Sequence, residues 1–338
     1  MLELLKTNKD IWELFTKKEE YFPSSLDEHE RFNYSLTKYK DIQQPIVSEF
    51  LIKNGLKIDF PDQKKFAVCL THDIDNVSIH WKRKYIDSFK KISEGKIKSA
   101  YDRSFKKDLF LNFNSIMNLE EKYNAKSSFF ILTAEKDVST NGLYDAEKFK
   151  NHLLNVIERG WEIGLHGGYY SFNKIQNLKF EKEKLEKIIG KKVIGYRSHY
   201  LRFKVPDSWI ILNQAGFKYD TTFGFPDMIG FRNGMCHPFN PYNLNTNTEI
   251  DILEVPLNIM DKTLFDYMNL NIKDSWELIK NLIDTVEKNN GVITILWHNT
   301  SMEDSKLQLY ENILKYCKNK NAWMTSAEKI FNFIKSNY

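Results

Sequence analysis

The stretch FAVCLTHDID at residues 66–75 decides the fold. Its first five residues are all apolar, so both faces of the strand that they form would be buried. Strands of this kind are typical of a parallel sheet that is covered by helices on both sides. The polar segment THDID then stands at the carboxyl end of the strand, where active sites gather in parallel α/β barrels.

Seven more short apolar runs follow, separated by stretches with helical periodicity such as residues 145–159. The predicted strands are SSFFIL (127–132), WEIGL (161–165), VIGY (193–196), FKYD (217–220), DILEV (251–255), GVITILW (291–297) and AWM (322–324). This repeated β–α order predicts an α/β protein, a deformed (β/α) barrel of seven or eight parallel strands over residues 61–338. Residues 1–60 are predicted to form a helical N-terminal extension.

The composition narrows the class of protein. The 338 residues are 42% hydrophobic and 28% charged, which indicates an ordered chain with a substantial core. The net charge of +4 is a mild basic bias, and no nucleic-acid-binding motif accompanies it. Three cysteines lie far apart and form no disulfide framework. Residues 1–20 lack the apolar centre of a signal peptide, and no stretch is apolar enough to cross a membrane, so we expect a cytoplasmic protein without a transmembrane segment.

Four of the predicted strands end in unusual polar sets. These are THDID (71–75), HGGYY (166–170), RSHYLR (197–202) and HN (298–299). A single histidine at a strand end is more often structural than functional, and two aspartates after a strand are often a helix cap. Four such sets at the same end of a parallel sheet are harder to explain in that way, because the fold brings them into one pocket.

The order and content of these sets resemble the motifs of the polysaccharide deacetylases, the NodB-homology or carbohydrate esterase family 4 enzymes. The resemblance runs from about Phe66 to about Trp323. It implies that Asp73 is the catalytic base and that Asp75 is a metal ligand. It further implies that His166 is a second ligand, that Arg197 orients the base, that the backbone N–H of Tyr200 faces the oxyanion, and that His298 is the general acid.

Two of the sets depart from the family pattern. Tyr170 stands where the family has its second metal-binding histidine, and His199 replaces the proline of the third motif. Because side chains alternate along a strand, His199 should share a side with Arg197, whereas His72 should point away from Asp73 unless the chain has already left the strand. We therefore prefer His199 as the third metal ligand, with His72 and Tyr170 as alternatives. A phenol with a pKa of about 10 is a poor ligand at neutral pH. His199 could instead only hydrogen-bond the substrate.

The resemblance implies one divalent metal ion. A carboxylate and two imidazoles suit zinc, and they also suit nickel, cobalt and iron. The expected function is removal of an N-acyl group, with N-acetyl expected, from an amino sugar in bacterial surface-glycan biosynthesis. The substrate would be an N-acylated sugar, a sugar nucleotide or a lipid-linked glycan. The alternatives are a deformylase or small-amide hydrolase on the same scaffold, and a catalytically inactive carbohydrate-binding relative.

Five further residues are candidate substrate contacts: Tyr170, Arg202, Arg232, His237 and Trp297. Arg232 and His237 belong to GFRNGMCHPFNPY (230–242), a long loop of the kind that often binds substrate at a barrel mouth. A simple turn explains this loop equally well. Tyr170 and Trp297 could stack on a sugar face or belong to the core. The sequence does not specify an oligomeric state.

Overall fold

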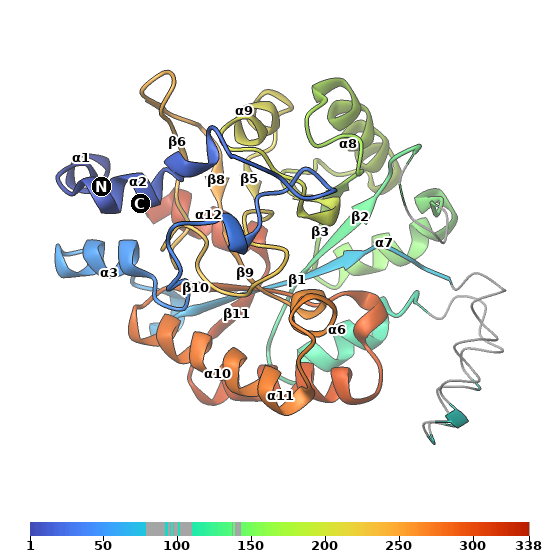
Figure 1. Ribbon diagram of the computed structural model, residues 1–338. Coiled ribbons are helices and arrows are strands. Elements are labelled where there is room, and N and C mark those ends of the chain that lie inside the picture. The colour runs from blue at the N-terminus through green and yellow to red at the C-terminus, as the bar shows by residue number, and fades with distance from the viewer. Residues whose placement is uncertain are drawn as a thin grey trace.

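The computed structural model describes residues 1–78, 110–136 and 143–337, together with positions 92, 93, 95, 97, 101 and 138 (Figure 1). Its centre is a parallel sheet with the strand order β8-β5-β4-β3-β2-β1-β10-β9. The strands are β1 (Ala67–Ile74), β2 (Ser128–Leu132), β3 (Glu162–Gly167), β4 (Gly195–Ser198), β5 (Tyr219–Asp220), β8 (Leu253–Glu254), β9 (Leu257–Met260) and β10 (Val292–Leu296). Strand β11 (Trp323–Thr325) pairs with the first half of β1, and β2 pairs with the second half. A separate hairpin joins β6 (Tyr242–Asn243) to β7 (Thr248–Glu249).

The two outer strands of this order, β8 and β9, are separated in the chain by only Val255 and Pro256. The sheet therefore curls until its edges meet, and a covalent link takes the place of a hydrogen-bonded ladder at the seam. This architecture confirms the predicted deformed (β/α) barrel. Strand β9 was absent from the predicted strands, because a proline just before a short apolar run indicates a break rather than a strand.

Helices surround the sheet (Figure 1). They are α6 (Phe113–Glu121), α7 (Lys150–Glu158), α8 (Ile175–Ile189), α9 (Asp207–Gln214), α10 (Ile272–Lys288), α11 (Asp304–Asn319) and α12 (Ala327–Asn337). The described short helical turns are η1 (Lys18–Glu20), η2 (Tyr34–Leu36), η3 (Pro61–Gln63), η4 (Ala146–Phe149), η5 (His199–Leu201), the π-helical η6 (Thr263–Tyr267) and η7 (Asn299–Ser301). As the sequence predicts, α7 stops just before Gly160, whose φ of 84° is favourable only for glycine.

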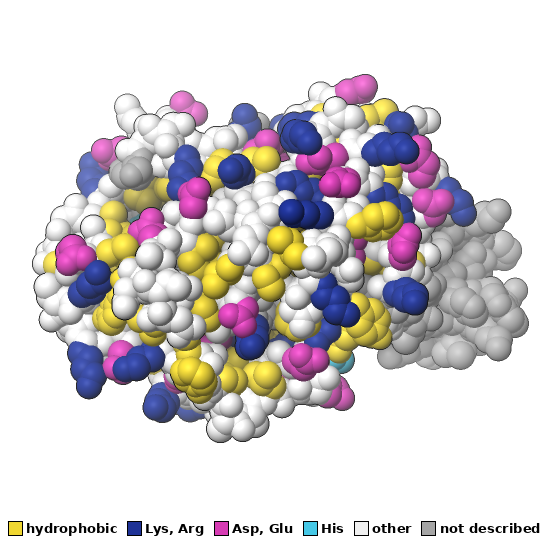
Figure 2. Space-filling model, turned by 90° about the horizontal axis from the view of Figure 1, so that it is seen from above, with side chains coloured by type: hydrophobic (Ala, Val, Ile, Leu, Met, Phe, Trp, Pro, Cys, Tyr) yellow, Lys and Arg dark blue, Asp and Glu magenta, His cyan; other side chains and the backbone are white. Residues whose placement is uncertain are grey.

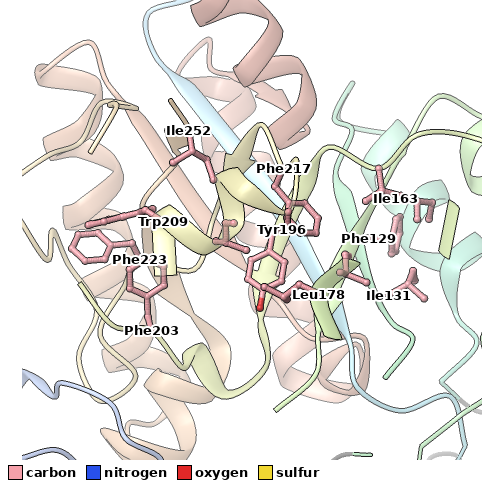
Figure 3. Close-up of a cluster of buried hydrophobic side chains, with 14 of the residues drawn as sticks. Phe129, Ile131, Ile163, Leu178, Tyr196, Phe203, Trp209, Phe217, Phe223 and Ile252 are labelled. Carbon is pink, nitrogen blue, oxygen red and sulfur yellow. The ribbon is translucent and has the colours of Figure 1, made fainter. Parts of the chain in front are cut away.

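Buried apolar side chains fill the space between the sheet and these helices. Figure 3 shows part of one such cluster, in which Tyr196 of β4 and Phe217 lie between a group around Phe129 and a group around Trp209 of α9. All four side chains are at most 3% exposed. Alternate residues of each strand thus anchor the sheet against the helices and leave the strand ends free to carry polar groups.

The N-terminal extension consists of α1 (Leu2–Lys6), α2 (Lys9–Phe15) and α3 (Ile46–Lys53), joined by irregular chain. Its apolar residues Leu5, Phe15 and Val47 belong to the same buried cluster as Phe129 of β2. The extension therefore shares a hydrophobic core with the barrel.

Lysine and arginine side chains are interspersed with aspartate and glutamate on the face shown in Figure 2. This distribution agrees with the small net charge of +4. In the described ranges, no helix is both long enough and apolar enough to cross a membrane.

The packing around β3 generates a stability prediction. A methyl group on Gly164 would lie 2.5 Å from Cε1 of Phe130, a fully buried ring on the neighbouring strand. Gly164→Ala should therefore lower the free energy of unfolding by about 1–3 kcal/mol, which urea denaturation would measure.

Phe130→Leu provides the matching test, because a smaller side chain makes room for the added methyl group. Gly164→Ala should cost less in the Phe130→Leu background than in the wild type. An unchanged urea midpoint for Gly164→Ala alone would contradict the steric explanation.

Candidate functional site

A pocket with a volume of about 330 Å³ lies where the carboxyl ends of β1, β3, β4, β9 and β10 meet. Its lining includes six residues from the predicted site: Asp73, Asp75, His166, His199, Tyr200 and His298. They come from four different strand ends, so the parallel sheet brings together groups that are far apart in the sequence. Residues from the N-terminal extension and from the segment after β9 complete the wall.

Three of these residues form a set that could hold a metal ion. One ligand atom from each of Asp75, His166 and His199 lies within 4.8 Å of the other two. The His166 Nε2 is 3.2 Å and the His199 Nε2 is 3.7 Å from Oδ1 of Asp75. All three side chains are buried. A carboxylate and two imidazoles that converge on one point match the donors of a catalytic zinc-type site with an open position.

Both ring nitrogens of His166 face hydrogen-bond acceptors. Its Nδ1 lies 3.1 Å from the backbone carbonyl of Arg197, which can only accept a hydrogen bond. A proton on Nδ1 satisfies this carbonyl and leaves Nε2, which lies 3.2 Å from Asp75 Oδ1, as the nitrogen that can bind a metal ion. Burial alone would lower the pKa of His166, but the carboxylates of Asp73 and Asp75 outweigh it and raise that pKa.

Lys262, which follows β9, binds the other oxygen of the Asp75 carboxylate. Its Nζ lies 2.6 Å from Oδ2. Burial would raise the pKa of Asp75, but the Lys262 ammonium and then the neighbouring histidines hold it well below its usual range. Asp75 is thus ionised, as a metal ligand must be, and Lys262 orients it from the side opposite His166.

Asp73 and Arg197 lie next to each other in an almost completely buried position. The Arg197 Nη1 is 3.8 Å from Asp73 Oδ1, and neither atom has a hydrogen-bond partner among the described residues. The guanidinium is anchored by Thr221, which accepts from Nε at 2.9 Å, and by Thr71, which accepts from Nη2 at 3.2 Å. Arg197 therefore offers a fixed positive charge to the Asp73 carboxylate.

His298 is oriented by a third buried carboxylate, that of Asp261. Its Nδ1 lies 2.5 Å from Oδ1 of Asp261, and its backbone N–H donates to Oδ2 at 3.2 Å. Burial would raise the pKa of Asp261, but His298 lowers it to about 2. Because the ionised carboxylate can only accept, Nδ1 carries a proton and Nε2 is directed toward the pocket, 3.6 Å from Asp75.

The loop after β3 is held by Glu181 of α8. The carboxylate accepts hydrogen bonds from the Gly168 N–H at 2.9 Å and from the Ser171 hydroxyl at 2.5 Å. Glu181 is only 3% exposed. This contact fixes the chain directly beyond His166.

Four candidates from the sequence lie away from this pocket. Both ring nitrogens of His72 are engaged, Nδ1 with the Trp297 carbonyl at 2.6 Å and Nε2 with Glu120 at 2.9 Å, which speaks against the alternative metal ligand. Trp297 is fully buried in a hydrophobic cluster. Its position speaks against stacking on a substrate.

The loop at residues 230–242 packs against the N-terminal extension instead of the barrel mouth. Arg232 forms a buried ion pair with Glu20, and the His237 Nδ1 lies 2.9 Å from the Ser48 hydroxyl. Neither side chain is more than 3% exposed. The structure thus places Arg232 and His237, two of the predicted substrate contacts, between the barrel and the extension and outside the lining of the pocket.

Tyr170 and Arg202 lie near the pocket without lining it. Tyr170 is 46% exposed and its ring packs edge-on against Tyr169, at a centroid distance of 5.1 Å. Arg202 is buried and donates to the backbone carbonyls of Tyr169 and His29. Tyr170 does not line the pocket that contains Asp75, His166 and His199.

The sequence analysis missed Arg31, Lys262, Asp261 and Tyr267. Asp261 and Lys262 directly follow β9, so recognising that strand would have placed a polar pair at the same edge of the sheet as the other motifs. Arg31 reaches the pocket from the N-terminal extension. No local pattern around Arg31 indicates this contact, because it depends on how two distant segments pack.

Comparisons with known proteins were made for sequence and for structure. No protein-family model matches the chain, and no curated protein matches it significantly. Among solved structures, an inferred polysaccharide deacetylase from Mycobacterium smegmatis matches with a TM-score of 0.59 at 17% identity, over 83% of this chain and 94% of that one. The Puue allantoinase matches with a TM-score of 0.58 at 14% identity, over 83% and 93% of the two chains. At such low identity the likeness concerns the fold alone, and the chain has the fold of the polysaccharide deacetylases, as its motifs predict.

Proposed function

We propose that this protein is a metal-dependent amide hydrolase that removes an N-acyl group, with N-acetyl expected, from an amino sugar. The observation that carries the proposal is the convergence of three sets of groups on one pocket. These are the Asp73–Arg197 pair, the Asp75–His166–His199 set and the Asp261–His298 pair. Hydrolysis of an amide needs a base, an electrophile and an acid; the first pair would supply the base, the second set would hold the metal ion that serves as electrophile, and the third pair would supply the acid.

Asp75, His166 and His199 would hold the metal ion. When bound, a divalent ion supplies a Lewis acid that activates water and polarises a carbonyl group. Zinc is the expected ion, and nickel, cobalt and iron also suit this ligand set. The contact of His166 Nδ1 with the Arg197 carbonyl, which leaves Nε2 for a metal ion, and the ionised state of Asp75 both favour binding of a cation.

Asp73 acts as the general base in this proposal. It takes a proton from the attacking water while Arg197 keeps its carboxylate in place and stabilises its charge. The backbone N–H of Tyr200 is proposed to donate to the oxyanion that forms as water adds to the carbonyl carbon, since Tyr200 lines the pocket. The water oxygen thus becomes part of the released carboxylic acid.

His298 acts as the general acid. An amine leaves an amide only after its nitrogen is protonated, so the reaction needs a donor on the leaving-group side. The Nε2 of His298 is directed into the pocket, and Asp261 stabilises the imidazolium that gives up this proton. The C–N bond then breaks and the amino sugar departs as the free amine.

The proposed substrate is an N-acylated amino sugar, as a sugar nucleotide or a lipid-linked glycan precursor. A pocket of about 330 Å³ lies at the lower end of the range for small-molecule sites, which suits one sugar unit. Tyr200 and Tyr267 give its wall aromatic surface against which a sugar ring can pack. The role in surface-glycan biosynthesis and the cytoplasmic location stay predictions from the sequence.

A small-amide hydrolase is the second candidate function. It is favoured by the likeness to an allantoinase, whose TM-score of 0.58 is almost equal to that of the deacetylase. The pocket chemistry is the same for both candidates, because fold and catalytic groups do not specify what is attached to the amide. Assays of N-acetylated amino sugars, their nucleotide derivatives and small cyclic and linear amides would separate the two.

Metal content tests the proposed ligand set. The wild type should bind about one ion per chain by elemental mass spectrometry after reconstitution, as expected for one three-ligand site. His166→Ala and His199→Ala should each lose the ion. His152→Ala is the matched control, since this histidine lies exposed on α7 and should leave the metal content unchanged. Full metal content in His199→Ala would contradict the assignment of His199 as the third ligand.

Asp73→Asn tests the general base. Removing the proton acceptor should lower kcat by about 10²–10⁴-fold, measured as release of acetate from the best substrate. The metal content should stay that of the wild type, because Asp73 is not in the ligand set. Asp59→Asn, an exposed substitution of the same kind, should behave like the wild type. Turnover of Asp73→Asn at the wild-type rate would refute the assignment.

His298→Ala tests the general acid through its dependence on the leaving group. The variant should lose most of its amide hydrolysis but retain much of its hydrolysis of p-nitrophenyl acetate, whose leaving group departs without a proton. Asp73→Asn should lose both activities, since both need the base. Equal losses of amide and ester hydrolysis in His298→Ala would show that His298 has another role.

A further inference from the structure

The third motif, RSHYLR, contains backbone that is unfavourable for its residues. Tyr200 has a φ of 62° and Leu201 a φ of 52°, so two consecutive non-glycine residues adopt the left-handed conformation. In this conformation the Cβ atom crowds the following carbonyl oxygen. Conformations of this kind persist only where surrounding contacts hold them, and they concentrate at functional sites. The contacts that hold this loop therefore matter to the pocket.

Two of those contacts come from the N-terminal extension. Arg31 donates from Nη1 to the backbone carbonyl of Tyr200 at 3.0 Å and from Nη2 to the Tyr267 hydroxyl at 3.1 Å. Its guanidinium is fixed in turn by Asp27, which accepts from Nε at 2.8 Å. Arg31 is only 5% exposed and lines the pocket. The Arg31 side chain thus joins the strained loop at Tyr200, the pocket wall at Tyr267 and its own segment at Asp27.

A second arginine makes the reciprocal connection. Arg202, at the end of the motif, donates from Nε to the backbone carbonyl of His29 at 2.9 Å and from Nη2 to Glu30 at 2.8 Å. The His29 ring also packs on the Tyr200 ring, at a centroid distance of 4.7 Å. Each segment therefore gives one arginine to a main-chain carbonyl of the other. In Figure 1 the chain between α2 and α3 passes over the strands of the barrel.

We infer that residues 27–31 are part of the active site, and that Arg31 is a positioning residue that holds the Tyr200 peptide and the adjacent His199 in their working geometry. The inference rests on the proposed function, in which His199 is a ligand and Tyr200 donates to the oxyanion. Residues 27–31 lie outside the range that resembles the polysaccharide deacetylases. They thereby determine the positions of two residues of the third motif, His199 and Tyr200. Misplacement of such groups by about 1 Å can cost roughly 100-fold in rate.

The double variant Asp27→Asn/Arg31→Met tests this inference. Methionine keeps the apolar stem of Arg31 but cannot donate to Tyr200, and asparagine avoids leaving a carboxylate without its cation. The asparagine oxygen can still accept from the N–H groups of His29 and Arg31, as the Asp27 carboxylate does at 2.9 and 2.8 Å, so the segment should keep its turn.

The matched control is Glu20→Gln/Arg232→Met. This pair also joins the extension to the barrel through a buried ion pair, but neither residue lines the pocket. Both double variants should lose stability to a similar degree, which thermal unfolding would record. The two variants should differ in the hydrogen exchange of residues 199–202 and in the kcat that depends on this loop.

Two readouts separate positioning from general stability. Amide hydrogen exchange of the segment 199–202 should accelerate in Asp27→Asn/Arg31→Met and not in the control, because the left-handed loop loses its holding contact. With the best substrate, kcat should fall roughly 10–100-fold in the first variant while KM changes little, and the control should keep the wild-type kcat.

The outcomes are distinct. Wild-type exchange and kcat in a folded Asp27→Asn/Arg31→Met would overturn the inference, as would equal losses in both double variants. A wild type that hydrolyses no amide would contradict the proposed function. If hydrogen exchange of 199–202 is still faster in Asp27→Asn/Arg31→Met and unchanged in Glu20→Gln/Arg232→Met, the positioning role stands on its own.

Discussion

Two buried carboxylates, Asp73 and Asp75, set the condition that the rest of the pocket has to meet. They are 2% and 6% exposed, and an isolated buried carboxylate is too costly to stay ionised. Arg197 compensates the first and Lys262 the second. Arg197 belongs to β4 and Lys262 follows β9, whereas both carboxylates come from the end of β1. The charge balance of the site therefore depends on the parallel sheet, which brings the ends of these three strands to one edge.

The alternation of short apolar strands with helices made the barrel predictable from the sequence. Runs such as FAVCL are apolar on both faces, and helices such as α7 end beside a glycine that marks a helix stop. Strand β9 could not be predicted in the same way. Its four residues follow Pro256, and they form a strand because they pair with β10, which is a tertiary contact rather than a local preference.

The motif residues of the site could also be predicted, since each follows an apolar strand directly in the chain. Lys262 was missed together with β9, which it follows, and Arg31 was missed because no local pattern indicates its contact with Tyr200, 169 positions away. The loop at 230–242 shows the opposite difficulty. Its prolines, arginine and histidine are typical of a substrate-binding loop, but the same residue types also serve an interface, and packing against α3 and η1 decided between the two.

The extension shares its core with the barrel and exchanges arginine contacts with the RSHYLR loop, which has a consequence for how such chains can be recombined. A chimera with a junction near residue 60 would combine one parent's extension with another parent's loop. The two strained peptides at Tyr200 and Leu201 would then lack the partner that holds them. Residues 27–31 and 199–202 should therefore be taken from the same parent, although Arg31 and Tyr200 are 169 positions apart in the chain.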